Sequence, residues 1–103
     1  MDELKIYDKA LSHYGIKNQL LMVMEECAEL SKECSKVYRA LDKGGTFKID
    51  NLAEEIADVQ ITTGQIQMFF GLKDKVKEQR KSKLKRLAER IENENCKNQT
   101  DIS

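Results

Sequence analysis

Residues 16–41 read IKNQLLMVMEECAELSKECSKVYRAL, and their apolar side chains recur at alternating steps of four and three. An α-helix makes one turn in about 3.6 residues, so side chains with this spacing lie along one side of the helix. The stretch therefore predicts a long helix that packs through one apolar seam. The seam positions are Ile16, Leu20, Val23, Cys27, Leu30, Cys34, Val37 and Leu41.

Two further helices are predicted on either side of this stretch. The first begins at Asp2 or Glu3 and ends before Gly15, because glycine readily adopts the left-handed conformation that stops a helix. The other follows a loop over residues 42–49, has Asp50 or Asn51 as its N-cap, and ends at Gly71. Its seam has the same steps: Leu52, Ile56, Val59, Thr63, Ile66 and Phe70.

A fourth helix is predicted from Leu72 to about residue 92, with Arg80 as the one charged position in its apolar stripe. The composition agrees with an all-helical chain, since it contains no Pro, five Gly and 35% charged residues. Short connections between four helices favour an all-α, four-helix antiparallel bundle. We expect residues 1–92 to form this single domain and residues 93–103 to form a polar, frayed C-terminal tail.

Composition also excludes several classes of protein. The N-terminus lacks the apolar run of a signal peptide and no stretch is apolar enough for a membrane span, so we expect a cytoplasmic protein with no membrane partner. The net charge is zero, which disfavours a general nucleic-acid binder. The three cysteines have no metal-ligand spacing. We expect Cys27 and Cys34 to pack in the apolar seam as small core residues.

A short acidic phrase occurs twice: residues 25–30 read EECAEL and residues 54–59 read EEIADV. Residues three apart lie on the same side of a helix, so each copy presents two neighbouring carboxylates. The pairs are Glu26 with Glu29 and Glu55 with Asp58. Four carboxylates repel one another unless a cation lies between them, and an all-oxygen cluster suits Mg²⁺, or alternatively Mn²⁺.

Each of these four acids directly precedes a seam position, so all four lie on the same flank of their helices. Antiparallel helices that face each other through their seams bring like flanks together, which predicts that the two pairs converge. In a simple hairpin the two acidic pairs would differ in position along the helix axes by roughly 14 Å, at a rise of 1.5 Å per residue. The loop must therefore run back along the bundle to bring the two pairs to the same level. Gln19, Lys83 and Arg86 occupy the same flank.

The two acidic motifs resemble those of the MazG-like all-α nucleoside triphosphate pyrophosphatases, relatives of the dimeric dUTPases and dCTPases. This resemblance implies hydrolysis of an NTP or dNTP to the monophosphate and pyrophosphate with Mg²⁺. It implies catalytic and metal-ligand roles for Glu26, Glu29, Glu55 and Asp58, and phosphate contacts from Lys83 and Arg86. Gln19 is a further candidate for substrate binding. Members of the family assemble into dimers or tetramers, so we expect a homodimer or homotetramer.

Two alternatives compete with this enzymatic function. A non-enzymatic helical oligomer would use its acidic and basic flanks for assembly or partner binding, and would show no saturable Mg²⁺ requirement. A di-iron carboxylate bundle requires Glu-x-x-His motifs. The sole histidine, His13, is far from both acidic phrases, so a di-iron centre is disfavoured.

Overall fold

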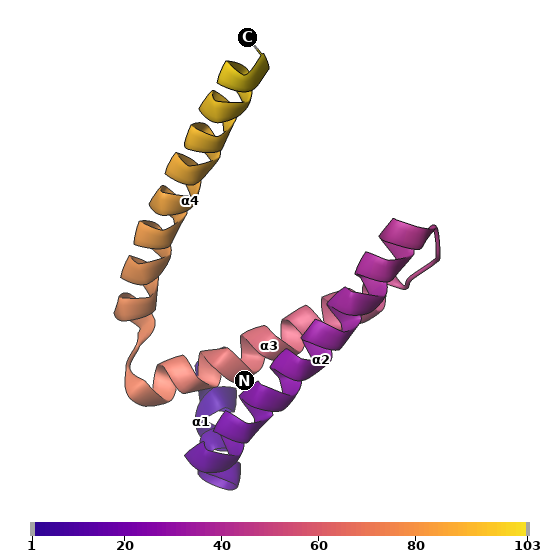
Figure 1. Cartoon of the computed structure of the whole chain (residues 1–103). Helices are drawn as coiled ribbons and strands as arrows, with labels where there is room; N and C mark the ends of the chain where they lie inside the picture. Colours follow the sequence, from indigo (N-terminus) through magenta and orange to yellow (C-terminus); the bar gives the residue numbers. More distant parts are fainter. Residues whose placement is uncertain (1, 103) are drawn as a thin grey trace. The chain divides into compact units, whose positions relative to one another are not determined.

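The computed structural model describes the backbone of residues 2–102 and the side chains of residues 2–97. Within these residues the chain forms four helices and no strand: α1 (Glu3–Tyr14), α2 (Ile16–Lys43), α3 (Ile49–Phe70) and α4 (Lys73–Ile102) (Figure 1). The prediction of an all-α fold is confirmed. The helices fall into two compact units, one that ends at Gly71 and contains α1 to α3, and one that begins at Leu72 and consists of α4. Over the described residues, none of the helices is both long and apolar enough to span a bilayer.

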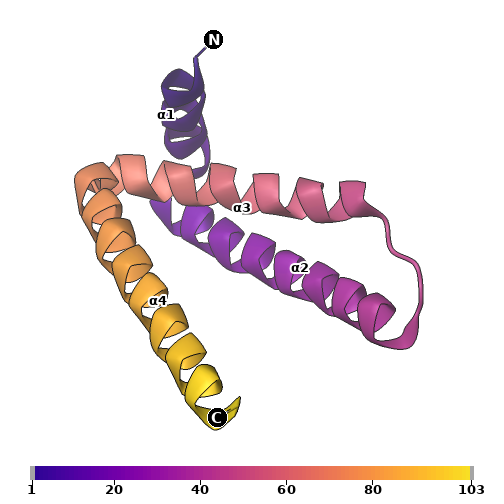
Figure 2. The same cartoon turned by 90° about the horizontal axis from the view of Figure 1, so that it is seen from above.

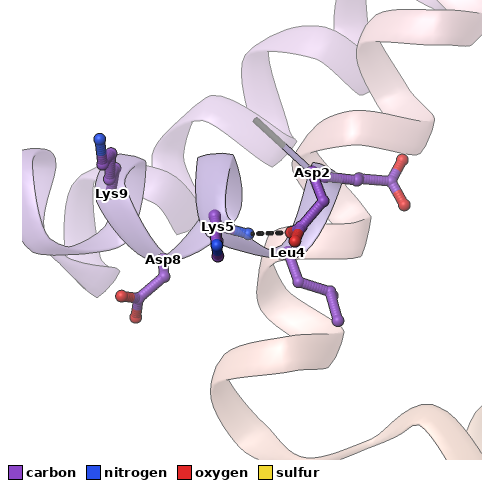
Figure 3. A pocket seen from close by; sticks show the side chains of 6 residues that line it. Asp2, Leu4, Lys5, Asp8 and Lys9 are labelled. Atoms are coloured by element: carbon purple, nitrogen blue, oxygen red, sulfur yellow. Dashed lines mark hydrogen bonds between the residues drawn. The ribbon is translucent and has the colours of Figure 1, made fainter.

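Most helix ends lie where the sequence predicts them. Asp2 caps α1, because its side chain accepts a hydrogen bond from the Lys5 backbone N–H at 2.9 Å (Figure 3). Gly71 ends α3 in the left-handed conformation with φ 62°, and its N–H donates to the carbonyl of Gln67. Gly44 also adopts the left-handed conformation, with φ 76°, and ends α2 after Lys43, two residues into the loop predicted over residues 42–49.

Two further boundaries differ from the prediction. The third helix begins at Ile49 after Lys48, which makes no side-chain cap, and not at the expected Asp50 or Asn51 cap. The backbone N–H of Asn51 donates instead to the Lys48 carbonyl at 3.1 Å. The fourth helix continues to Ile102, beyond residue 92. The chain contains no Pro, and no Gly follows Gly71, so no residue after that point strongly opposes a helix.

Helices α2 and α3 run in opposite directions side by side (Figures 1 and 2). The predicted seam is only partly correct, because the structure divides it between two sides of the helix pair. Ile16, Val23, Leu30 and Val37 on α2, and Leu52, Val59 and Ile66 on α3, are partly buried as predicted. The other apolar positions are exposed: Leu20, Cys27, Cys34, Leu41, Ile56 and Phe70.

The residues on the polar flank of the seam are buried or half-buried beside these apolar residues. On α2 this flank consists of Gln19, Glu26, Glu33 and Ala40, which follow one another at steps of seven. Ala40 is 8% exposed, and its small side chain lets the loop return closely over α2, where the Gly45 N–H donates to the Ala40 carbonyl. The expectation that Cys27 and Cys34 are core residues is therefore wrong, since both lie on the opposite flank and are exposed.

Helix α1 packs against α3 through Tyr7, which is 7% exposed. The ring lies directly over Gly64, where an added Cβ would be 2.8 Å from both Cε2 and Oη of Tyr7. Glycine at this position therefore permits the close approach of the two helices. The contact fixes the N-terminal helix beside the surface that carries the acidic residues.

We expect Gly64→Ala to destabilise the chain, although alanine is the better helix former. Forcing a methyl group into a packed contact costs about 1 to 3 kcal/mol, whereas the helix preference returns only about 1 kcal/mol. Chemical denaturation should show a lower free energy of unfolding. In a Tyr7→Ala background the same change should be neutral or stabilising. An equal loss in both backgrounds would contradict the contact.

Candidate metal centre

Three carboxylates from two helices meet at the interface of α2 and α3. Glu26 comes from α2, and Glu55 and Asp58 come from α3; one oxygen of each lies within 4.8 Å of the others. Glu26 and Glu55 are half-buried and Asp58 is exposed. The predicted offset is removed because α2 extends past the start of α3 and the loop returns along it (Figure 1).

The crowding of these acids changes their protonation. Partial burial raises the pKa of Glu26, and the neighbouring Asp58 and Glu55 charges raise it further. Burial likewise raises the pKa of Glu55, followed by the charges of Asp58 and Glu29. Both carboxyls therefore hold protons more strongly than isolated glutamates, and a cation among them would reverse this effect.

One atom of the cluster has an unusual environment. Glu55 Oε2 is buried, and among the buried side-chain nitrogen and oxygen atoms of residues 2–97 it is the one without a hydrogen-bond partner. Buried polar atoms in folded proteins nearly always have a hydrogen-bond partner, so a buried oxygen that no protein group contacts is suited to bind a cation. An anionic oxygen beside two further carboxylates fits a hard divalent cation such as Mg²⁺.

Glu29, the fourth predicted ligand, lies at the edge of this cluster. Its side chain is exposed, and it is not among the three acids whose oxygens approach within 4.8 Å. Its charge nevertheless contributes to the raised pKa values of both Glu26 and Glu55. Three of the four predicted ligands thus meet, and the fourth is an electrostatic neighbour. Glu25 and Glu54 are both exposed; Glu25 lines a neighbouring cavity, and the charge of Glu54 adds to the raised pKa of Glu55.

A cavity of about 590 Å³ adjoins the carboxylates and shares Glu26 and Asp58 in its wall. Its volume falls within the range of about 300 to 1,000 Å³ that is typical of small-molecule sites. Residues from all three helices of the first unit contribute to its lining: Tyr14, Gln19, Met22, Ile61, Thr62 and Gln65. The cavity therefore combines an anionic end with apolar surfaces and two amides.

The two amides bond to each other. Gln19 Nε2 donates to Gln65 Oε1 at 2.6 Å, and both side chains are buried, at 6% and 5% exposure. Gln19 thus lines the cavity next to the carboxylates, but as half of a buried pair. This hydrogen bond occupies neither the Gln19 carbonyl oxygen nor the Gln65 amino group. The pair presents one acceptor and one donor.

Sequence reasoning missed Gln65 and Glu33. Gln65 lies seven residues after Asp58, and Glu33 lies seven after Glu26, so a heptad step from each acidic motif would have found them. Glu33 is 8% exposed, its Oε2 lies 3.7 Å from Lys36 Nζ, and its charge adds to the raised pKa of Glu55. Glu33 therefore continues the line of acidic residues on α2 that includes Glu26.

The predicted phosphate ligands Lys83 and Arg86 lie on α4, in the second unit, and both side chains are exposed. Their role in substrate binding stays a prediction. Comparisons of this chain with protein-family models, curated proteins and solved structures find no match. The resemblance to the pyrophosphatases therefore rests on the motifs themselves.

Without metal ions, the stability of the protein should fall as the pH rises above the ordinary glutamate pKa of 4.5. Between this value and the raised pKa values of Glu26 and Glu55, the folded state keeps protons that the unfolded chain has released, so rising pH favours unfolding. Thermal unfolding in EDTA should show Glu55→Gln to be more stable than wild type at neutral pH. This difference should shrink toward pH 4.5.

Excess Mg²⁺ should raise the unfolding temperature of the wild type more than that of Glu55→Gln, because a ligand that binds the folded state stabilises it. The matched control is Glu54→Gln, the same change at the neighbouring exposed residue; the Glu54 charge is a lesser contributor to the raised pKa of Glu55, so this variant should alter the profile less than Glu55→Gln does. A stability difference between wild type and Glu55→Gln that did not vary with pH would contradict the raised pKa.

Proposed function

We propose that the protein is a Mg²⁺-dependent nucleoside triphosphate pyrophosphohydrolase, which converts an NTP or dNTP to the monophosphate and pyrophosphate. The observation that carries this proposal is the convergence of Glu26, Glu55 and Asp58 at one end of a cavity of suitable size. A triphosphate needs a hard cation at its anionic end, and a nucleoside needs an apolar cavity with a few polar groups. The doubled acidic motif supports the same reading.

Glu26, Glu55 and Asp58 would hold the cation, with the unpartnered Glu55 Oε2 as a ready ligand. When bound, Mg²⁺ neutralises the phosphate charge that grows as pyrophosphate departs. Glu29 lies beside this cluster without belonging to it, which suits a carboxylate that orients water and accepts its proton. Water then attacks the α-phosphorus, the bond from that phosphorus to the bridging oxygen breaks, and pyrophosphate leaves.

The base and sugar would enter the cavity between α1, α2 and α3. Met22 and Ile61 offer apolar contact, while the Gln19–Gln65 pair offers an acceptor and a donor to the edge of a heterocycle. Lys83 and Arg86 would contact the phosphates through charged hydrogen bonds. Self-association into a dimer or tetramer belongs to the same proposal. The rival function, a helical oligomer without catalysis, differs in having no metal-dependent turnover.

Incubation of the full chain with each NTP and dNTP in Mg²⁺ should yield monophosphate and pyrophosphate in equal amounts. Glu55→Gln and Asp58→Asn should lower turnover by about 100-fold or more, since even residues that only support metal ligands contribute 10- to 100-fold. Circular dichroism should show the helices retained. The control Glu54→Gln should stay within a few fold of wild type. Absence of hydrolysis with every nucleotide, or full activity of either ligand variant at limiting Mg²⁺, would refute the proposal.

The cations on α4 provide a second test. Lys83→Ala and Arg86→Ala should each raise KM or lower kcat by roughly 10- to 100-fold, because a charged hydrogen bond contributes about 1.5 to 3 kcal/mol. Lys73→Ala removes the same charge near the start of α4 and should have little effect. Small, equal effects at all three positions would indicate a solvated basic helix with no phosphate contact.

A further inference from the structure

A second cavity, of about 450 Å³, lies at the end of the α2–α3 pair that carries the connecting loop, far from α1 (Figure 2). Its volume is within the range of about 300 to 1,000 Å³ that is typical of small-molecule sites. We call it the loop cavity. Its charged lining residues are Glu33, Lys36, Arg39 and Lys43 on α2 and Lys48 in the loop.

The three cations of α2 lie on one side of that helix. Lys36, Arg39 and Lys43 follow at steps of three and four, which places them within about 60° of one another around the axis. Like charges at such steps repel each other and lower helix stability. A cation near the C-terminal end of a helix is favoured by the helix dipole, but this effect is confined to the last turn. The dipole therefore accounts for Lys43 and not for Lys36 or Arg39.

The loop adds a fourth cation at a position where a helix disfavours one. Lys48 is the N-cap of α3, where its side chain caps no N–H group and its charge lies at the positive end of the helix dipole. Asn51, in the first turn of α3, also lines the cavity, so this positive end is part of the wall. A residue choice that opposes local stability in this way is typical of a binding site.

Most of these cations have no acidic partner. Over residues 2–97 the structure contains one ion pair, between Lys36 Nζ and Glu33 Oε2 at 3.7 Å. The other three cations of the cavity have no ion-pair partner among these residues, and the nearby acids Asp42 and Asp50 do not line the wall. Four positive charges and one negative charge leave the cavity with a net charge of +3. A concave site with this excess charge attracts anions.

We propose that the loop cavity binds a small anion that carries two phosphate groups, at a site separate from the metal centre. Each phosphate group has a charge of about −1.5 to −2 at neutral pH, so two of them match the charge of the cavity. The Arg39 guanidinium suits paired hydrogen bonds to one phosphate, and the lysines act as point charges. The hydroxyl of Thr46 and the amide of Asn51, which also line the cavity, supply neutral donors.

The loop cavity lies too far from the metal centre to hold the phosphates of the same ligand. Arg39 comes 13 residues after Glu26 on α2, hence about 20 Å along the axis at 1.5 Å per residue, which exceeds the length of a triphosphate chain. The cavity that adjoins the carboxylates extends the other way along α2, toward Gln19. The anion is therefore a second molecule, and this inference does not depend on the proposed catalytic function.

Titration calorimetry of the full chain with inorganic pyrophosphate, in buffer freed of divalent cations by a chelating resin, should show one binding site per chain. Without a cation the metal centre is anionic and repels the probe. Arg39→Gln and Lys43→Gln should each weaken binding by about 10-fold or more, because each removes a charged hydrogen bond. Both residues are exposed, so circular dichroism should show the helices retained. The matched control is Lys17→Gln, an exposed cation at the other end of α2, which should change the affinity little.

Glu33→Gln tests the same site in the opposite direction. This change keeps the size of the buried side chain, releases Lys36 from its ion pair and removes the negative charge of the wall, so pyrophosphate should bind several-fold more tightly. A variant that merely disturbed the fold would weaken binding.

The source of the anion is identified by a parallel titration with a nucleoside diphosphate. Tighter binding than that of pyrophosphate would identify a nucleotide as the ligand, and equal or weaker binding would identify the free anion. The proposal is overturned if millimolar pyrophosphate does not bind, or if Lys17→Gln weakens binding as much as Arg39→Gln and Lys43→Gln. Unchanged or weaker binding by Glu33→Gln would also overturn it.

Discussion

The mutual repulsion of carboxylates placed between two packed helices is the constraint on which the rest of this structure depends. Glu26 and Glu55 occupy inner positions of the α2–α3 interface, where helix pairs normally place apolar side chains, and Asp58 completes the cluster at its edge. The apolar row from Ile16 to Val37 and the Gln19–Gln65 hydrogen bond hold the helices together despite this repulsion. Carboxylates at these positions lower the stability of the helix pair but favour a bound cation. This combination is typical of a binding site.

Because the polar flank of α2 lies in the interface with α3, the opposite flank of α2 is exposed. Because the acids and amides turn inward, Leu20, Cys27 and Cys34 turn outward with the uncharged residues beside them. The α2–α3 pair thus has an anionic side that adjoins a cavity and, opposite to it, an uncharged side.

The sequence predicted the helical class, the ends at Gly15 and Gly71, and the convergence of the two acidic motifs, because glycine conformation and helical periodicity are local properties. It did not predict which flank of the seam is buried. Hydrophobicity favours the apolar flank, yet the structure buries the polar one, where Ala40 is small and Gln19 meets Gln65. A single glutamine on a helix resembles a solvated residue, and only its partner on another helix shows otherwise. The close contact of Tyr7 with Gly64 was likewise invisible, since it joins residues far apart in sequence.

The account requires that a divalent cation binds between α2 and α3, and anomalous diffraction from crystals soaked in Mn²⁺ tests this most directly. Manganese is an appropriate probe because it takes the same oxygen ligands as Mg²⁺ and scatters anomalously. The account predicts an anomalous peak in contact with carboxylate oxygens of Glu26, Glu55 and Asp58, and loss of that peak in Glu55→Gln. No peak at these residues in saturating Mn²⁺, or an equal peak in the variant, would contradict it.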